Sequence, residues 1–323
     1  MTAGSPTIVF AEIPGRKSIG SAAALMVAAN GWRMISVSNV NQAITALKTN
    51  NNVRVLVSNE PSLSLFEAAV ESHSNIIKIL VTDLPMPEYC ALLEQKDLQL
   101  IDHLVANLDV EWTTSDLAIT LQKLIRRDYF GIEKYLSPES SVKEHVIKGS
   151  SDRDIYNKHV QDWVEACGIG KNIGRLAYGI CEELLMNAVY DAPIAGGRKH
   201  YEQYERYESR YLAPDEWATL KYGVDGRIFA ISITDPFGAF VREKWFSYLR
   251  KALKRDDSDT LIDTKKNGAG LGLFKMLYSS HGVVCNVDPG KITEVIILIS
   301  LNQPVRDFVH MPRSIHYFST SSH

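Results

Sequence analysis

The sequence predicts an α/β protein built from a doubly wound parallel sheet followed by an α/β sandwich. Over residues 6–127, short apolar runs alternate with single amphipathic segments, the pattern of parallel strands joined by crossover helices. From residue 154 onward the order changes, because helical segments come first and strand-like segments follow. The 323 residues are enough for two ordinary domains.

The first domain is expected to occupy residues 1–127. Its predicted strands are 7–13, 33–37, 53–57, 76–81 and 103–105, and its predicted helices are 21–30, 41–49 and 115–127. Asn30-Gly31 is a typical helix stop, and Leu117, Leu121 and Leu124 give the last helix an apolar face. Strands separated by single helices indicate a parallel sheet of the doubly wound type.

The second domain is expected over residues 154–301, after a connector at 128–153 and before a C-terminal tail at 302–323. Its predicted helices are 154–167, 173–190 and 271–281, and its predicted strands are 218–224, 227–234, 283–287 and 293–300. Asp225-Gly226 between the first two strands is a strong β-hairpin signal. Helices followed by strands of this kind indicate an α/β sandwich.

The composition is that of a globular protein and argues against several classes of partner. A net charge of −3 offers no electrostatic case for binding nucleic acid or an anionic membrane. The cysteines are scattered with no Cys-x-x-Cys, which argues against a zinc site or a disulfide framework and fits a reducing cytoplasm. No basic leader precedes an apolar core, and no apolar run is long enough to cross a bilayer. We therefore expect a cytoplasmic protein without nucleic acid or membrane as a partner.

Three polar residues recur every four positions in the predicted helix 173–190. Glu183, Asn187 and Asp191 therefore share one face, beside apolar positions such as Leu184 and Val189. Such a polar row suits a magnesium–triphosphate site, because Mg²⁺ prefers oxygen ligands, keeps several waters and needs few protein groups. The alternative is the solvated polar face of an ordinary helix.

Two further motifs follow in the same domain. Asp235 ends a predicted strand, and Gly238 follows it in an Asp-x-x-Gly turn, which is weak evidence alone because such dipeptides are common in turns. The most specific motif is a glycine-rich run directly before a helix: Gly268, Gly270, Leu271 and Gly272. Its glycines free backbone N–H groups to face phosphates at the positive end of that helix.

The position of the glycine-rich run, near the end of the domain and not in an opening βαβ unit, disfavours a dinucleotide site. Lys266 lies just before the run and is a candidate phosphate ligand, as are Arg198 and Lys199 in the basic segment 193–214. For all three, solvated loop charges are the alternative.

In this order the three motifs resemble the nucleotide-binding boxes of the GHKL (Bergerat-type) ATPases, which include gyrase, Hsp90, histidine kinases, MutL and the anti-sigma-factor serine kinases. The resemblance implies ATP and Mg²⁺ as cofactors. It makes Asn187 the metal ligand and Glu183 the general base on a water or a substrate hydroxyl. It also implies that the Asp235 carboxylate accepts a hydrogen bond from the adenine amino group, that the backbone at Gly238 approaches the base, and that Thr293 lies near the nucleotide. Residues 241–267 would form the nucleotide lid.

The layout from Asp154 onward resembles the anti-sigma-factor serine kinases most closely: one helix, a Gly break, then the helix with Glu183 and Asn187. This resemblance implies a signalling protein that acts as a Ser/Thr protein kinase or a partner-switching regulator. Two alternatives stay open: a non-catalytic, ATP-gated protein-interaction module, and a sensorless histidine kinase with His145 or His159 as phosphoacceptor.

The first domain resembles the receiver domains of response regulators in its strand and helix order. Glu12 lies near the first acidic site and Thr82 at the fourth, but Asn59 follows the third strand where a receiver carries Asp, and Val105-Ala106-Asn107 offers no Lys. We therefore expect a pseudo-receiver that cannot take an aspartyl phosphate; a flavodoxin-like domain without receiver ancestry is the alternative. Its expected role is contact with a protein partner, homodimerisation or regulation of the ATPase half.

Overall fold

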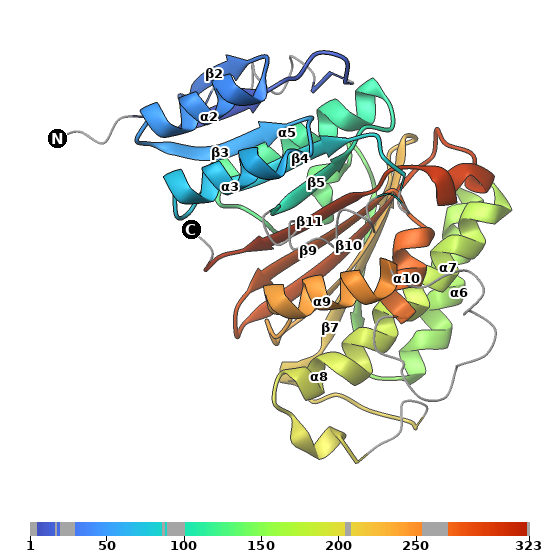
Figure 1. Ribbon diagram of the computed structural model, residues 1–323. Coiled ribbons are helices and arrows are strands. Elements are labelled where there is room, and N and C mark those ends of the chain that lie inside the picture. Colours follow the sequence, from blue (N-terminus) through green and yellow to red (C-terminus); the bar gives the residue numbers. More distant parts are fainter. Residues whose placement is uncertain are drawn as a thin grey trace. The chain divides into compact units, whose positions relative to one another are not determined.

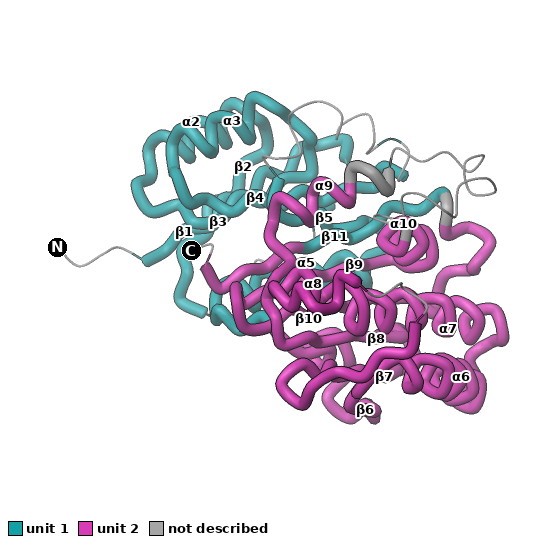
Figure 2. Tube along the Cα trace, turned by 90° about the horizontal axis from the view of Figure 1, so that it is seen from below, with its two compact units in different colours: residues 1–129, 310–316, 322–323 teal, residues 130–309, 317–321 magenta. Residues whose placement is uncertain are grey.

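The computed structural model describes residues 5–16, 18–19, 30–85, 88, 101–203, 208–253 and 271–321 of a mixed α/β protein (Figure 1). The chain divides into two compact units, shown in Figure 2. Unit 1 comprises residues 1–129, 310–316 and 322–323, and unit 2 comprises residues 130–309 and 317–321.

Unit 1 contains the parallel sheet that the alternating pattern predicts. Its strands are β1 (Thr7–Ala11), β2 (Arg33–Val37), β3 (Val53–Ser58), β4 (Ile77–Thr82) and β5 (His103–Ala106). They lie in the order β2-β1-β3-β4-β5, and every neighbouring pair is parallel. The strands β1, β4 and β5 are buried along their whole length, as expected for a sheet covered by helices.

The described helices of unit 1 are α2 (Val40–Thr49), α3 (Leu63–Ser72) and α5 (Val110–Arg126). The side chain of Asn39 caps α2 and that of Asp109 caps α5, each accepting a hydrogen bond from the backbone N–H three residues on. The cap at Asp109 starts α5 five residues before the predicted residue 115, and α3 is a helix that was not predicted. The predicted helix 21–30 lies outside the described residues, except for its last residue.

Asn59 occupies the carboxyl end of β3, and its side chain closes a loop. Its Oδ1 accepts from Ile13 N at 2.7 Å, and its Nδ2 donates to Ile13 O at 3.2 Å. The residue is 5% exposed. The amide thus ties the segment after β1 to the end of β3, a structural use of the position where a receiver carries Asp.

The described part of the segment 302–323, which was expected as a tail, contains regular structure instead. They hold η7 (Val305–His310) and β11 (Ser314–Ser319), and β11 contributes Ser314–His316 to unit 1. There β11 pairs antiparallel with β5. The pairing is reinforced by Asp116 of α5, which accepts from Ser314 Oγ at 2.5 Å and from His316 Nε2 at 3.1 Å.

Unit 2 contains an antiparallel sheet in the order β9-β10-β8-β7-β6. Its strands are β6 (Val142–Ile147), β7 (Ala218–Val224), β8 (Ile228–Asp235), β9 (Gly282–Asp288) and β10 (Ile292–Ser300). Residues 317–321 add a backbone hydrogen bond from Thr320 N to Val287 O. The segment 128–153, expected as a connector, instead supplies η2 (Ile132–Tyr135) and β6.

The helices of unit 2 are α6 (Ser151–Ala166), α7 (Lys171–Met186), α8 (Ala192–Ala195), α9 (Arg242–Leu253) and α10 (Leu271–Tyr278). Helix α7 packs on β8, α10 packs on β9, and α6 packs on α7 (Figure 1). Short helical turns η3 (Asn187–Asp191), η4 (Lys199–Tyr201) and η5 (Pro214–Glu216) complete the layer. This arrangement places the carboxyl end of α7 above the end of β8, where the candidate site lies.

The carboxylate of Asp116 generates a first prediction. Asp116→Ala leaves the buried Ser314 hydroxyl and the buried His316 ring without their acceptor, at a cost of about 1–3 kcal/mol for each group. We expect a loss of about 2–5 kcal/mol in the free energy of unfolding, measured by urea denaturation with circular dichroism. Gln122→Ala on the same helix is the control and should stay within about 0.5 kcal/mol; an equally small change in Asp116→Ala would contradict the prediction.

Candidate functional site

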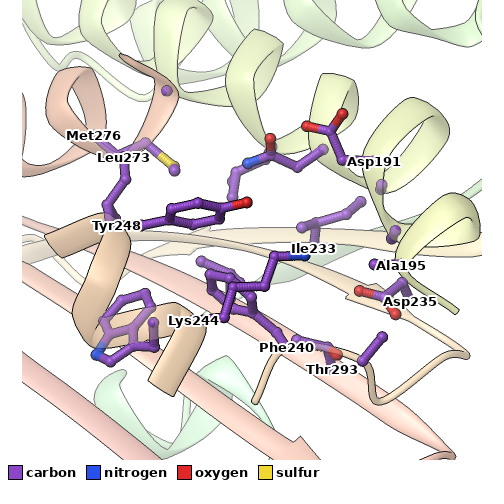
Figure 3. A pocket seen from close by; sticks show the side chains of 18 of the residues that line it. Asp191, Ala195, Ile233, Asp235, Phe240, Lys244, Tyr248, Leu273, Met276 and Thr293 are labelled. Carbon is purple, nitrogen blue, oxygen red and sulfur yellow. The ribbon is translucent and has the colours of Figure 1, made fainter. Parts of the chain in front are cut away.

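A cavity of about 470 Å³ lies within unit 2, a volume typical of small-molecule sites. Its walls come from α7 and η3, the ends of β8 and β10, and the helices α9 and α10 (Figure 3). Several of the residues predicted to bind a nucleotide line it: Asn187, Asp191, Asp235, Gly272 and Thr293. These residues are far apart in the sequence, so the fold itself brings them to one space.

Asn187 and Asp191 reach the cavity through a change in helix type. Helix α7 ends at Met186, and residues Asn187–Asp191 form η3, a single π-helical turn in which Ala192 N donates to Asn187 O. Such turns are frequent at functional sites because they widen the helix locally. An amide oxygen and a carboxylate beside one cavity are ligand types that Mg²⁺ prefers, so these residues fit the cation that the sequence implies.

Asp235 is the last residue of β8 and pairs across the sheet with Thr293 of β10. The residue is 9% exposed, and its carboxylate accepts from Phe237 N at 3.0 Å and is also hydrogen-bonded by Gly238 N and the Thr293 hydroxyl. Burial raises the pKa of Asp235 to about 7 against the opposing effect of these hydrogen bonds. A buried carboxylate facing a cavity is suited to accept a hydrogen bond from a ligand amino group.

Gly238 is not among the lining residues of the cavity, and the contacts it makes in the structure are with the turn between β9 and β10; its approach to an adenine base stays a prediction. Its φ is +58°, and a Cβ would lie 2.2 Å from Asp288 O and 2.5 Å from Lys291 N. Its carbonyl accepts from Gly290 N at 3.1 Å. The glycine therefore lets the turn after Asp235 pack on the β9–β10 turn, which fixes the end of β8.

Gly272 lines the cavity from the first turn of α10 and lies against Glu183 of α7. A Cβ at Gly272 would be 2.6 Å from Glu183 Oε2, so a larger residue here would displace the carboxylate from its present position. The other oxygen of Glu183 forms an ion pair with Lys275 Nζ at 2.5 Å. Leu271 begins α10, whereas Gly268, Gly270 and Lys266 lie outside the described residues.

The basic residues near the cavity are distributed differently from the sequence prediction. Arg198 forms ion pairs with Asp215 and Glu216, each at 2.8 Å. Lys199 is exposed in η4 and does not line the cavity. In the part of the chain that the structure describes, Lys244 is the only Lys or Arg that lines it.

Lys244 lies on α9, within the segment 241–267 expected as a lid, of which residues 254–267 lie outside the described residues. Figure 3 shows its side chain reaching toward the middle of the cavity, with Tyr248 on one side and Asp235 on the other. Sequence analysis missed this helix. The apolar spacing of Trp245 and Leu249, both 1% exposed, was the available signal.

The two candidate phosphoacceptor histidines lie together, away from the cavity lining. His145 is on β6 and His159 on α6, with ring centroids 5.2 Å apart, and His145 Nε2 is 3.0 Å from the Tyr222 hydroxyl. Burial lowers the pKa of His145, with smaller contributions from His159 and Lys143. His159 is exposed on its helix.

Comparisons with known proteins give little guidance. No protein-family model matches the chain, and no curated protein matches it. Among solved structures, the crystal structure of the SiaB-SiaC complex from Pseudomonas aeruginosa is similar at 14% identity, over 56% of this chain and 98% of that chain, with a TM-score of 0.32. A likeness this weak says nothing about the function of this chain.

No helix among the described residues is long and apolar enough to cross a membrane.

Gly238 and Gly290 form a matched pair of positions for testing the close packing of the turn after Asp235 on the turn between β9 and β10. Both have positive φ, but a Cβ at Gly290 meets nothing within 4 Å, whereas one at Gly238 meets backbone. We expect Gly290→Ala to cost about 1–2 kcal/mol from the backbone conformation alone. Gly238→Ala should cost at least about 1–3 kcal/mol more, because backbone must move to admit the methyl group. Thermal and urea unfolding measure both, and equal losses would refute the close approach.

Proposed function

We propose that unit 2 binds Mg²⁺–ATP in this cavity and that the chain is a signalling protein, a Ser/Thr protein kinase or partner-switching regulator of the anti-sigma-factor type. The observation that carries the proposal is the meeting of Asn187, Asp235 and Gly272 at one cavity, from a helix end, a strand end and a helix start. A solvated polar helix face would have left the row of Glu183, Asn187 and Asp191 without such a cavity.

Each lining residue has a chemical role in this proposal. Asp235 accepts from the adenine amino group, and Ile233 and Phe240 offer apolar surface to the ring. Asn187 and Asp191 would hold Mg²⁺, which when bound neutralises and orients the nucleotide phosphates. Lys244, the only Lys or Arg among the described residues that lines the cavity, supplies a positive charge there.

Glu183 is the proposed general base. It accepts the proton of the attacking hydroxyl as the phosphoryl group passes from ATP to that oxygen and ADP leaves. Its Oε1 is engaged by Lys275, and its Oε2 lies against Gly272 at the cavity lining. For proton transfer, Oε2 must meet the acceptor hydroxyl, or Lys275 must move away from Oε1.

The ion pair of Glu183 with Lys275 also favours a second candidate function, a non-catalytic module that is gated by ATP. A carboxylate held by an ammonium group 2.5 Å away is less available as a base. In that case the nucleotide would only fix the position of α9, which lines the cavity through Lys244, and a protein partner would recognise the ATP-bound state. His145 and His159, whose rings are neighbours, are the candidate phosphoacceptors of the histidine-kinase alternative. Acid-labile phosphate on either residue would support that alternative.

The raised pKa of Asp235 gives a pH dependence for nucleotide binding. An amino donor favours the ionised carboxylate, so affinity should be constant above about pH 7 and fall as the pH drops through that value. Isothermal calorimetry should show Mg²⁺–ATP binding about tenfold more weakly at pH 6 than at pH 8. Asp235→Asn should bind weakly and without this pH dependence.

Inosine triphosphate is the matched ligand control, because it carries a carbonyl where adenine carries the amino group. It should bind at least about tenfold more weakly than ATP at pH 8. Equal affinity for the two nucleotides, or equal affinity for ATP at the two pH values, would contradict recognition of adenine by Asp235. No binding by the wild-type protein would remove the proposed function.

Catalysis by Glu183 is tested with Mg²⁺–ATP hydrolysis, where water replaces the protein acceptor. Glu183→Gln should lower the turnover at least about 100-fold and leave the dissociation constant for ATP within about threefold. Glu182→Gln is the control, since Glu182 contacts Asn157 and Arg153 of α6 and not the cavity. Unchanged hydrolysis in Glu183→Gln would refute the base, and hydrolysis absent already in the wild type would favour the non-catalytic module.

A further inference from the structure

The carboxyl end of the helix that carries Asn187 contains a proline with a structural consequence. In a continuous α-helix the carbonyl of Val189 would accept from the N–H of residue 193, but Pro193 has no N–H. Val189 is 1% exposed, so water cannot readily replace the missing donor. A buried carbonyl without a donor is costly, so another group is required here.

Arg210 supplies the missing donors. Its Nη1 donates to Val189 O at 3.1 Å and to Tyr190 O at 3.2 Å, and its Nη2 donates to Tyr201 O at 3.2 Å. The guanidinium lies 4.7 Å from the ring centre of Tyr190 and 4.6 Å from that of Tyr201. A planar fork with several fixed donors suits this task, and a single ammonium group does not.

The backbone of Arg210 is itself fixed. Its N–H donates to Ser150 Oγ at 2.9 Å, and its carbonyl accepts from Ser150 N at 2.8 Å. A Cβ at Gly149 would lie 2.3 Å from Arg210 O, so this contact requires glycine. Arg210 is 5% exposed. The side chain is thus anchored to the start of α6 and has little freedom to move with the helix end it supports.

We propose that Arg210 is a positioning residue for the nucleotide site, which rests on the function proposed above. By holding the carbonyls of Val189 and Tyr190, Arg210 fixes the π-helical turn η3, and with it the directions of Asn187 and Asp191 toward the cavity. Its effect is therefore on the part of the affinity that depends on Mg²⁺. The carboxylate of Asp235, on β8, is held by Phe237 N, Gly238 N and the Thr293 hydroxyl, so its contact with the adenine should change less.

The experiment compares Arg210→Lys with the wild type by calorimetry, using ATP with Mg²⁺ and ATP with EDTA. We expect Arg210→Lys to lose at least about tenfold in affinity with Mg²⁺, and to bind ATP in EDTA within about twofold of the wild type. Arg198→Lys is the matched control, because Arg198 lies in the same segment but pairs with Asp215 and Glu216. It should keep the wild-type response to Mg²⁺.

A rescue variant separates positioning from general packing. Pro193→Ala restores an N–H that can donate to Val189 O, so Pro193→Ala combined with Arg210→Lys should recover most of the Mg²⁺-dependent affinity. Failure of this double variant to recover, or a normal Mg²⁺ response in Arg210→Lys, would overturn the role of Arg210 while leaving ATP binding by the wild type in place. A wild type that binds no nucleotide in either condition would overturn the proposed function, and the positioning role with it.

Discussion

The antiparallel pairing of β8 with β10 is the constraint on which the candidate site depends. Its register places Asp235 opposite Thr293 and Ile233 opposite Val295, and these four residues line one cavity. Because side chains alternate between the faces of a sheet, a slip of one residue would turn Asp235 away from the cavity. The register is fixed by burial along both strands, since β8 and β10 are almost wholly buried. The buried sheet of unit 2 thus fixes the positions of these four residues, and α7, α9 and α10 contribute further residues to the cavity lining.

Whether a feature of the fold or the site can be predicted from the sequence depends on how far apart in the chain its interacting residues lie. The strands of unit 1 are local patterns, and periodicity predicted them. The four-residue spacing of Glu183, Asn187 and Asp191 is also local, but its interpretation as a nucleotide site came from the resemblance of three separate motifs. The packing of Gly238 on residues 288–291 and the pair of Glu183 with Lys275 join segments far apart in the sequence. No local pattern encodes them. Strand β6 was missed for a related reason: its residues are mostly exposed, so its apolar signal is weak, and it is defined by pairing with β7.

The charges around the cavity explain why an ion pair can decide between catalysis and binding. Asp191, Asp235 and the nearby Glu183 are acidic; Lys244 lines the same cavity, and Lys275 pairs with Glu183. A triphosphate entering this space would add negative charge, which a cation and, among the described residues, these lysines could offset. If the cavity takes ATP as proposed, its phosphates would compete with Glu183 for Lys275. A nucleotide that attracted the ammonium group away would free the carboxylate as a base only when ATP is present. A Glu183 that kept its partner would leave a site that binds ATP without reacting.

The two units use the same kind of position in different ways. In unit 1, polar residues at the carboxyl ends of strands close loops: Glu12 Oε1 accepts from Ser18 Oγ and Ile19 N, Asn59 bonds Ile13, and Thr82 Oγ1 accepts from Leu84 N. In unit 2, Asp235 and Thr293 at strand ends line a cavity. A polar residue after a buried strand is thus ambiguous in sequence, because loop closure and ligand binding draw on the same side chains. The difference lies in what faces the group: a backbone segment satisfies Asn59 within the fold, whereas the cavity beside Asp235 leaves room for a ligand to donate.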